Sequence, residues 1–237
     1  MRHDRIDFIS AYCDRWCERC AFTTRCSAFT AEAAIAMCGG DTAGPGLAAG
    51  RPLPSGRGVV RPAPPSWIAE LEPGEATAAE QAEFARRERE RSARVEDTAI
   101  MKVAWAFTLI AHRWLAARHD AVAAGADALV REALAIVLHD CTLITVKLSR
   151  ALDGYDRCRH DGNEEDHPVQ NDWNGTAKVA LISMTRSEAA WRALAEATGD
   201  ETPAILADQL SGLAREVEAT FPQAQAFIRP GFDEPGV

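Results

Sequence analysis

Residues 127–152 read DALVREALAIVLHDCTLITVKLSRAL, a run without glycine or proline in which apolar residues recur every three or four positions. This spacing is typical of a helix that buries one of its faces. The predicted buried stripe consists of Leu134, Leu138, Cys141, Thr145, Leu148 and Leu152. Gly125 precedes the run and Gly154 follows it, so we expect the helix to end near these two residues.

Three further segments have the same helical periodicity. They cover about 77–118, 176–199 and 202–221. The first begins with a capping box, Thr77-x-x-Glu80, and the last begins with Thr202 as N-cap and Pro203 at the first helical position. Strand signals are nearly absent. The sequence therefore predicts an all-α fold in which four helices form an up-down bundle.

The composition changes sharply along the chain, and these changes predict four parts. Residues 1–38 form a small Cys-rich helical segment that binds a metal or cluster, and residues 39–75 form a Gly/Pro-rich linker or surface arm. Residues 76–225 hold the helical bundle, and residues 226–237 are a C-terminal tail.

The N-terminal part contains YCDRWCERCAFTTRC at residues 12–26, with four cysteines in the spacing C-x3-C-x2-C-x5-C. The candidate ligands are Cys13, Cys17, Cys20 and Cys26. Four thiolates this close together favour zinc or an iron–sulfur cluster over hard cations. A helix over residues 6–20 would place the first three cysteines on one face, and the fourth would return from the following turn.

The last three of these cysteines have the C-x2-C-x5-C spacing of the cluster loop in endonuclease III-type DNA glycosylases, and Ala21-Phe22 also resembles that loop. The resemblance implies that Cys17, Cys20 and Cys26 hold a [4Fe-4S] cluster. It covers about fifteen residues. Only three residues separate the first two cysteines, where the family has six, and no helix-hairpin-helix signature precedes them. The resemblance thus implies a cluster and no glycosylase activity.

Two other uses of the cysteines compete with a cluster. Disulfides are disfavoured because MRHDRIDFIS has no apolar signal-peptide core and because seven cysteines are an odd number, which together favour a reducing, cytoplasmic compartment. Structural zinc usually uses two C-x2-C pairs separated by a longer spacer. Ligands confined to one short run favour [4Fe-4S], with zinc as the alternative.

Several polar residues occupy central positions of the predicted bundle helices. They are His139, Asp140, Lys147, Lys178, Arg186 and Glu188. A buried charge must be paired, neutralised or bound to a metal. These residues could therefore line an enzymatic pocket, but the favoured reading is a buried salt-bridge network among Asp140, Lys147, Arg186 and Glu188.

Charge and hydropathy limit the classes of partner. A net charge of −9 disfavours a large nucleic-acid interface, which would need clustered positive charge. No apolar run approaches the ~20 residues of a membrane-spanning helix. The sequence does not indicate the oligomeric state.

These observations leave three hypotheses. The favoured one is a [4Fe-4S] protein that transfers electrons or senses redox state, with the bundle as the body that docks a redox or protein partner. The alternatives are a cluster-containing enzyme with a polar pocket inside the bundle, and a zinc-stabilised interaction module without a redox role.

Overall fold

The structure is a computed structural model that describes residues 5–38, 77–161 and 167–234. Within these ranges the chain forms six α-helices and no β-strand, which confirms the all-α prediction. The predicted arm at 39–75 lies outside the described residues. The chain forms two compact units. The first contains 5–10, 17–38 and 77–90, and the second contains 11–16 together with the described residues from 91 onward.

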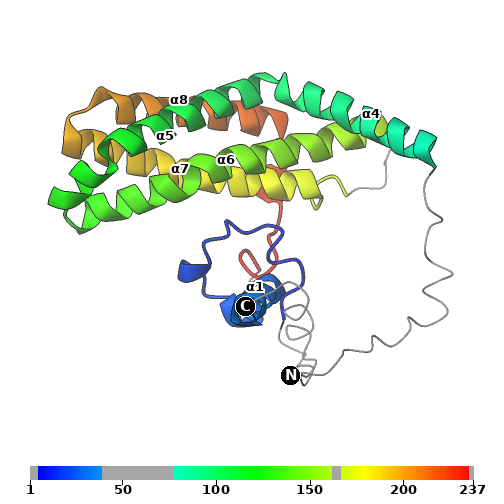
Figure 1. The fold of residues 1–237 in the computed structure, drawn as a ribbon, viewed down its shortest axis with the longest axis horizontal. Helices are drawn as coiled ribbons and strands as arrows, with labels where there is room; N and C mark the ends of the chain where they lie inside the picture. The colour runs from blue at the N-terminus through cyan, green and yellow to red at the C-terminus, as the bar shows by residue number, and fades with distance from the viewer. Residues whose placement is uncertain (1–4, 39–76, 162–166, 235–237) are drawn as a thin grey trace. The chain divides into compact units, whose positions relative to one another are not determined.

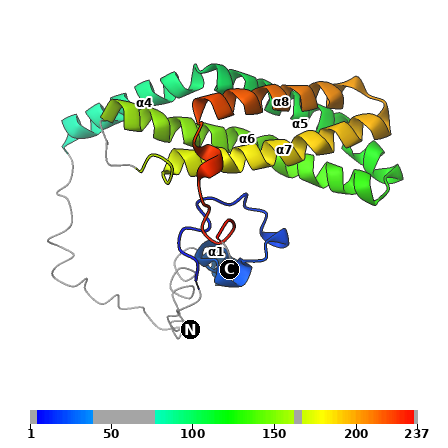
Figure 2. The same ribbon diagram turned by 180° about the vertical axis from the view of Figure 1, so that it is seen from behind.

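Four helices of the second unit lie side by side, as both views of the chain show (Figures 1 and 2). They are α5 (Ala99–Gly125), α6 (Ala128–Asp161), α7 (Asp172–Thr198) and α8 (Glu201–Thr220). Helix α6 packs against α5 and α7, and α8 packs against α5 and α7, so all four share one core. None of the described helices is both long and apolar enough to span a membrane.

The shared core, which we call the α5–α8 core, is built from the buried apolar faces of these four helices. Its largest fully buried side chains include Phe107, Met101, Ile144, Leu148, Met184, Trp191, Leu194, Leu206, Leu210 and Leu213. Leu138 is an exception to the predicted stripe of α6, because 53 % of its side chain is exposed. It lies at the edge of a buried face that is centred on Val137, Cys141 and Ile144.

The predicted helix at 77–118 is two helices, α4 (Ala78–Glu96) and α5. The chain leaves helical geometry at Thr98, whose side-chain oxygen accepts a hydrogen bond from the Met101 amide at 3.2 Å and so caps α5. Apolar periodicity continues through the break, which is why the sequence pattern did not reveal it. The capping box at the start of α4 is present, with hydrogen bonds between Thr77 and Glu80.

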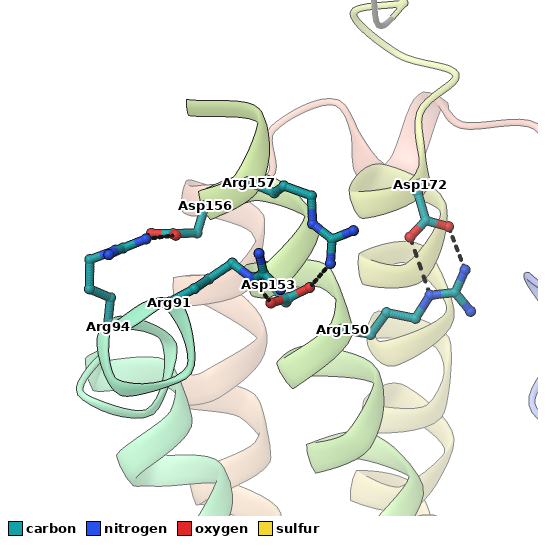
Figure 3. A network of polar contacts seen from close by, with 7 residues as sticks. All are labelled: Arg91, Arg94, Arg150, Asp153, Asp156, Arg157 and Asp172. Carbon is teal, nitrogen blue, oxygen red and sulfur yellow. Dashed lines mark hydrogen bonds and ion pairs between the residues drawn. The ribbon is translucent and has the colours of Figure 1, made fainter. Parts of the chain in front are cut away.

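Helix α6 continues past Gly154 to Asp161, beyond the end predicted near Leu152. Ion pairs on its last turns hold it against the end of α4 (Figure 3). Arg91 pairs with Asp153 at 2.6 Å, and Arg94 pairs with Asp156 at 2.6 Å. A single glycine lowers helix propensity by only about 1 kcal/mol, so these tertiary contacts outweigh its cost.

Side-chain caps place the N-termini of α7 and α8 earlier than the sequence predicted. The Asn171 side chain accepts from the Asn174 amide at 2.9 Å, so α7 begins at Asp172 and not near Thr176. At the next turn Gly199 has a φ of 65°, and Asp200 caps α8 by accepting from the Thr202 amide at 2.9 Å. The predicted N-cap Thr202 therefore lies inside α8.

The predicted helix over residues 6–20 does not form. Phe8 and Arg15 both have a φ of 61°, which interrupts a right-handed helix, and the Asp14 carboxylate accepts from the Trp16 amide in a local turn. Only the 3-10 turns η1 (Cys17–Arg19) and η2 (Thr23–Arg25) occur before α1 (Ser27–Cys38). The cysteines therefore do not share one helix face.

Candidate metal centre

The four candidate cysteines form no disulfide, and all are half-buried. They are Cys13, Cys17, Cys20 and Cys26. Cys13 belongs to the second compact unit, whereas the other three belong to the first. Half-burial suits a metal ligand, because a fully exposed thiol would leave the site open to water and a fully buried one would resist ionisation.

Backbone amides donate to three of the four sulfurs. The Phe22 amide lies 3.4 Å from Cys20 Sγ, and the Phe29 amide lies 3.5 Å from Cys26 Sγ. The Arg15 amide donates to the Cys13 sulfur in the same way. Hydrogen bonds of this kind stabilise a thiolate and influence the potential of a cluster that it ligates.

Across residues 5–38, 77–161 and 167–234, no group of three or more His, Cys, Asp or Glu side chains is placed to hold a metal ion. The donor chemistry of the block fits a soft metal, but its backbone would have to close around that metal. Such coupling of metal binding to local folding is common in small metal sites.

The segment 11–16, which carries Cys13, is anchored on the α5–α8 core by aromatic contacts. The Trp16 ring stacks on His139 of α6 with 4.3 Å between ring centroids, and His139 Nε2 lies 3.0 Å from the Asp14 carbonyl oxygen. The Tyr12 ring packs against Phe227 with 4.7 Å between centroids. We call this segment and its contacts the anchor.

An ion-pair triad that contains one fully buried carboxylate fixes the centre of the anchor. Arg186 of α7 donates two hydrogen bonds to the Asp140 carboxylate of α6, at 2.6 and 2.7 Å, and it also pairs with Asp14. The Asp140 side chain is fully buried. The Arg186 guanidinium also lies over the Trp16 ring, 5.1 Å from its centroid. The triad thus joins α6, α7 and the segment beside Cys13.

The two carboxylates of the triad differ in acidity. Burial raises the pKa of Asp140 above its ordinary value, although the hydrogen bonds from Arg186 oppose that rise. Partial burial also raises the pKa of Asp14, but hydrogen bonds from Arg186 and the Trp16 amide outweigh it, so that its pKa is lowered. Asp14 is therefore ionised at neutral pH and pairs with Arg186 as a carboxylate.

Lys147 of α6 is a further cation near Cys13, besides Arg15. Only 6 % of this residue is exposed, and its ammonium lies 3.5 Å from the Ala11 carbonyl oxygen. Burial lowers the pKa of Lys147, and burial raises the pKa of the Cys13 thiol. The charge of Lys147 acts in the opposite sense on Cys13, because it favours the thiolate.

The predicted salt-bridge network is correct for one pair and wrong in its extent. Asp140 and Arg186 pair as expected, but Glu188 pairs with Arg192 at 2.9 Å. Lys147 contacts the backbone of the anchor and no carboxylate of that network. Of the polar residues expected to form a pocket, His139, Lys147 and Arg186 contact segment 11–16, and Asp140 supports Arg186.

Sequence reasoning missed Asp14 and Gly175. Asp14 lies between two candidate ligands in the sequence, and nothing in its neighbourhood indicates a partner on α7. Gly175 lies where a Cβ atom would approach Tyr12 to 2.5 Å and Phe227 to 2.6 Å. A glycine in the first turn of α7 was the only available signal of this close approach.

Lys178 belongs to a second cluster, at the C-terminal segment. Its ammonium lies 2.7 Å from the Asp233 carboxylate and 2.6 Å from the Phe227 carbonyl oxygen. Arg229 pairs with the same carboxylate at 2.8 Å. Residues 227–234, which the sequence left as a tail, are therefore held on α7 in the described range.

This cluster predicts an acid-sensitive contribution to stability. Burial raises the pKa of Asp233, but hydrogen bonds from Arg229 and Lys178 outweigh it, so the folded-state pKa lies below the ordinary value of about 3.9. A depressed carboxyl pKa stabilises the fold above pH ~4, and this stabilisation is lost as the pH falls towards the folded-state value.

We therefore expect Asp233→Asn to lower the melting temperature at pH 7, and the difference from the wild type to shrink between pH 4 and pH 2. Thermal unfolding followed by circular dichroism measures both. A difference that stays constant from pH 7 to pH 2 would contradict the assigned charge pairing.

Comparison with known proteins identifies no relative: no protein-family model, curated protein or solved structure matches this chain.

Proposed function

We propose that the cysteine block binds a [4Fe-4S] cluster and that the protein uses it in electron transfer or redox sensing. The ligands in this proposal are Cys13, Cys17, Cys20 and Cys26. The observation that carries it is the four-thiol run together with the backbone amides that donate to the Cys13, Cys20 and Cys26 sulfurs. A [4Fe-4S] cluster supplies reversible one-electron chemistry.

The protein's own residues would contribute position and charge. The anchor holds Cys13 close to the core through Tyr12, Asp14 and Trp16, while the rest of the block has only short 3-10 turns and can adjust. Lys147 would offset part of the negative charge that four thiolates bring. Cys13 would thus be a metal ligand whose position is fixed by the folded core.

The α5–α8 core serves in this proposal as an up-down four-helix bundle that docks a protein partner. A reducing compartment such as the cytoplasm suits free thiols and a cluster. The enzymatic alternative is less favoured, because the polar residues expected to form its pocket are occupied by the anchor. Zinc would use the same four thiolates and remains the alternative that metal analysis distinguishes.

Substitution of single cysteines tests the proposal. We expect Cys20→Ala, purified without oxygen, to lose the bound metal while α5–α8 stay helical, because three thiolates cannot complete the site. Cys158→Ala is the matched control, since Cys158 is also a half-buried free thiol but lies on α6 outside the block. Iron, sulfide and zinc per chain are measured for both variants and the wild type. Equal metal content in all three would refute the ligand assignment.

Lys147→Met separates a structural from a functional role for the buried cation. Replacing a buried charge with an apolar side chain of similar length is expected to stabilise the fold by on the order of 1 kcal/mol. If Lys147 serves the metal centre, the same variant lowers the reduction potential, because a nearby positive charge is lost. Urea unfolding and a redox titration measure the two effects. A loss of stability with an unchanged potential would show that Lys147 acts only through Ala11.

A further inference from the structure

A cavity of about 620 Å³ lies where the α4–α5 link, the last turns of α6 and the end of α8 meet. Val95, Ile100 and Leu152 form part of its apolar lining, and Tyr155 also lines it. This volume is in the range of pockets that bind small molecules, roughly 300–1,000 Å³. None of the residues of the cysteine block or the anchor lines it.

The Arg94–Asp156 ion pair joins two walls of this cavity, the end of α4 and α6. Arg94 makes two contacts with the Asp156 carboxylate, at 2.6 and 3.1 Å, and Arg91 pairs with Asp153 one turn away (Figure 3). Figure 3 shows that both pairs reach from the end of α4 to α6. They fix the α4–α5 link beside α6, so the space between them is part of the fold.

Arg159 is the side chain at the rim that can bind an anion. The Asp156 carboxylate is already paired with Arg94, which leaves Glu216 as the other acid of the lining. The Arg159 guanidinium lies over the Tyr155 ring, 5.6 Å from its centroid. It has no carboxylate partner among the described residues. Ala99 and Ile100, in the first turn of α5, also line the cavity.

We propose that this cavity binds a small amphipathic carboxylate. Its apolar body lies on Val95, Ile100 and Leu152, and its carboxylate is held by Arg159. An apolar floor with a few polar groups at one side is the usual composition of a ligand pocket. Arginine is the side chain best suited to bind a carboxylate through paired hydrogen bonds.

Decanoate is a suitable probe, with decanol and decylamine as controls of the same chain length. Isothermal titration of the full chain is expected to show one decanoate site per chain, at least tenfold tighter than decanol, with decylamine the weakest of the three. Equal affinity for decanoate and decanol, or tighter binding of decylamine, would overturn the assignment of an anionic ligand.

Two variants at exposed positions locate the site without disturbing the core. Ala219→Trp fills the cavity from α8 and is expected to abolish decanoate binding, and Arg159→Glu is expected to weaken it at least tenfold. Arg113→Glu on the exposed face of α5 changes the net charge equally but lies outside the cavity, so it should leave binding unchanged. Decanoate binding that survives Ala219→Trp would overturn the proposed location.

Discussion

Arg186→Met is expected to destabilise the α5–α8 core by about 3–5 kcal/mol, because it leaves a buried carboxylate without its partner. Asp140 is fully buried and receives two hydrogen bonds from Arg186, and Asp14 loses the same partner. Part of the penalty is relieved if Asp140 takes up a proton, which its raised pKa makes easier. Urea unfolding followed by circular dichroism measures the change in the free energy of unfolding.

Two companion variants make this result specific. Arg192 lies on the same helix, but its ion pairs are exposed. We therefore expect Arg192→Met to lower the free energy of unfolding by less than about 1 kcal/mol. Adding Asp140→Leu to Arg186→Met removes the orphaned carboxylate and should recover much of the lost stability. If Arg186→Met costs no more than Arg192→Met, the triad does not stabilise the core as described.

Gly175→Ala is expected to destabilise the protein by about 1–3 kcal/mol, as overpacking of a close contact does. The added Cβ would meet the rings of Tyr12 and Phe227 at 2.5–2.6 Å, so at least one of the two rings must move. The variant should therefore lower the stability of the fold and also weaken the packing of segment 11–16 on α7. Hydrogen exchange at residues 11–16 would then be faster than in the wild type.

Gly212→Ala is the matched control, because it makes the same change inside α8. Its Cβ would meet only the end of the Arg215 side chain, at 3.9 Å. With no clash, the higher helix propensity of alanine should stabilise the protein by roughly 0.5–1 kcal/mol. The two substitutions are thus expected to have opposite signs. Stabilisation by Gly175→Ala would show that the anchor does not pack closely on α7.

The helices of the core were predictable because burial imposes a period on the sequence. Leu206, Leu210, Leu213 and Val217 follow that period and are all buried. Helix ends were less predictable, since they depend on a single hydrogen bond. Thr98 and Asp200 decide the starts of α5 and α8, but many polar residues near a helix end could serve as caps.

The sequence indicated the candidate donor atoms of the site, which stay a prediction, but it did not indicate the residues that support them. Four clustered cysteines indicate a soft-metal site by composition alone. The backbone of the first three cysteines was predicted as one helix, but Arg15 has a positive φ and Trp16 stacks on His139. No local sequence pattern indicates either feature. The partner of Asp14 is distant in sequence, and long-range pairing of this kind leaves no periodic signal.

The most direct test of the proposed function is the absorption spectrum of the wild-type protein purified without oxygen, with iron, sulfide and zinc measured per chain. The proposal predicts a brown protein that absorbs near ~400 nm and contains about four iron and four sulfide per chain, as a [4Fe-4S] cluster requires. A colourless protein with one zinc per chain, or with no metal at all, would contradict it.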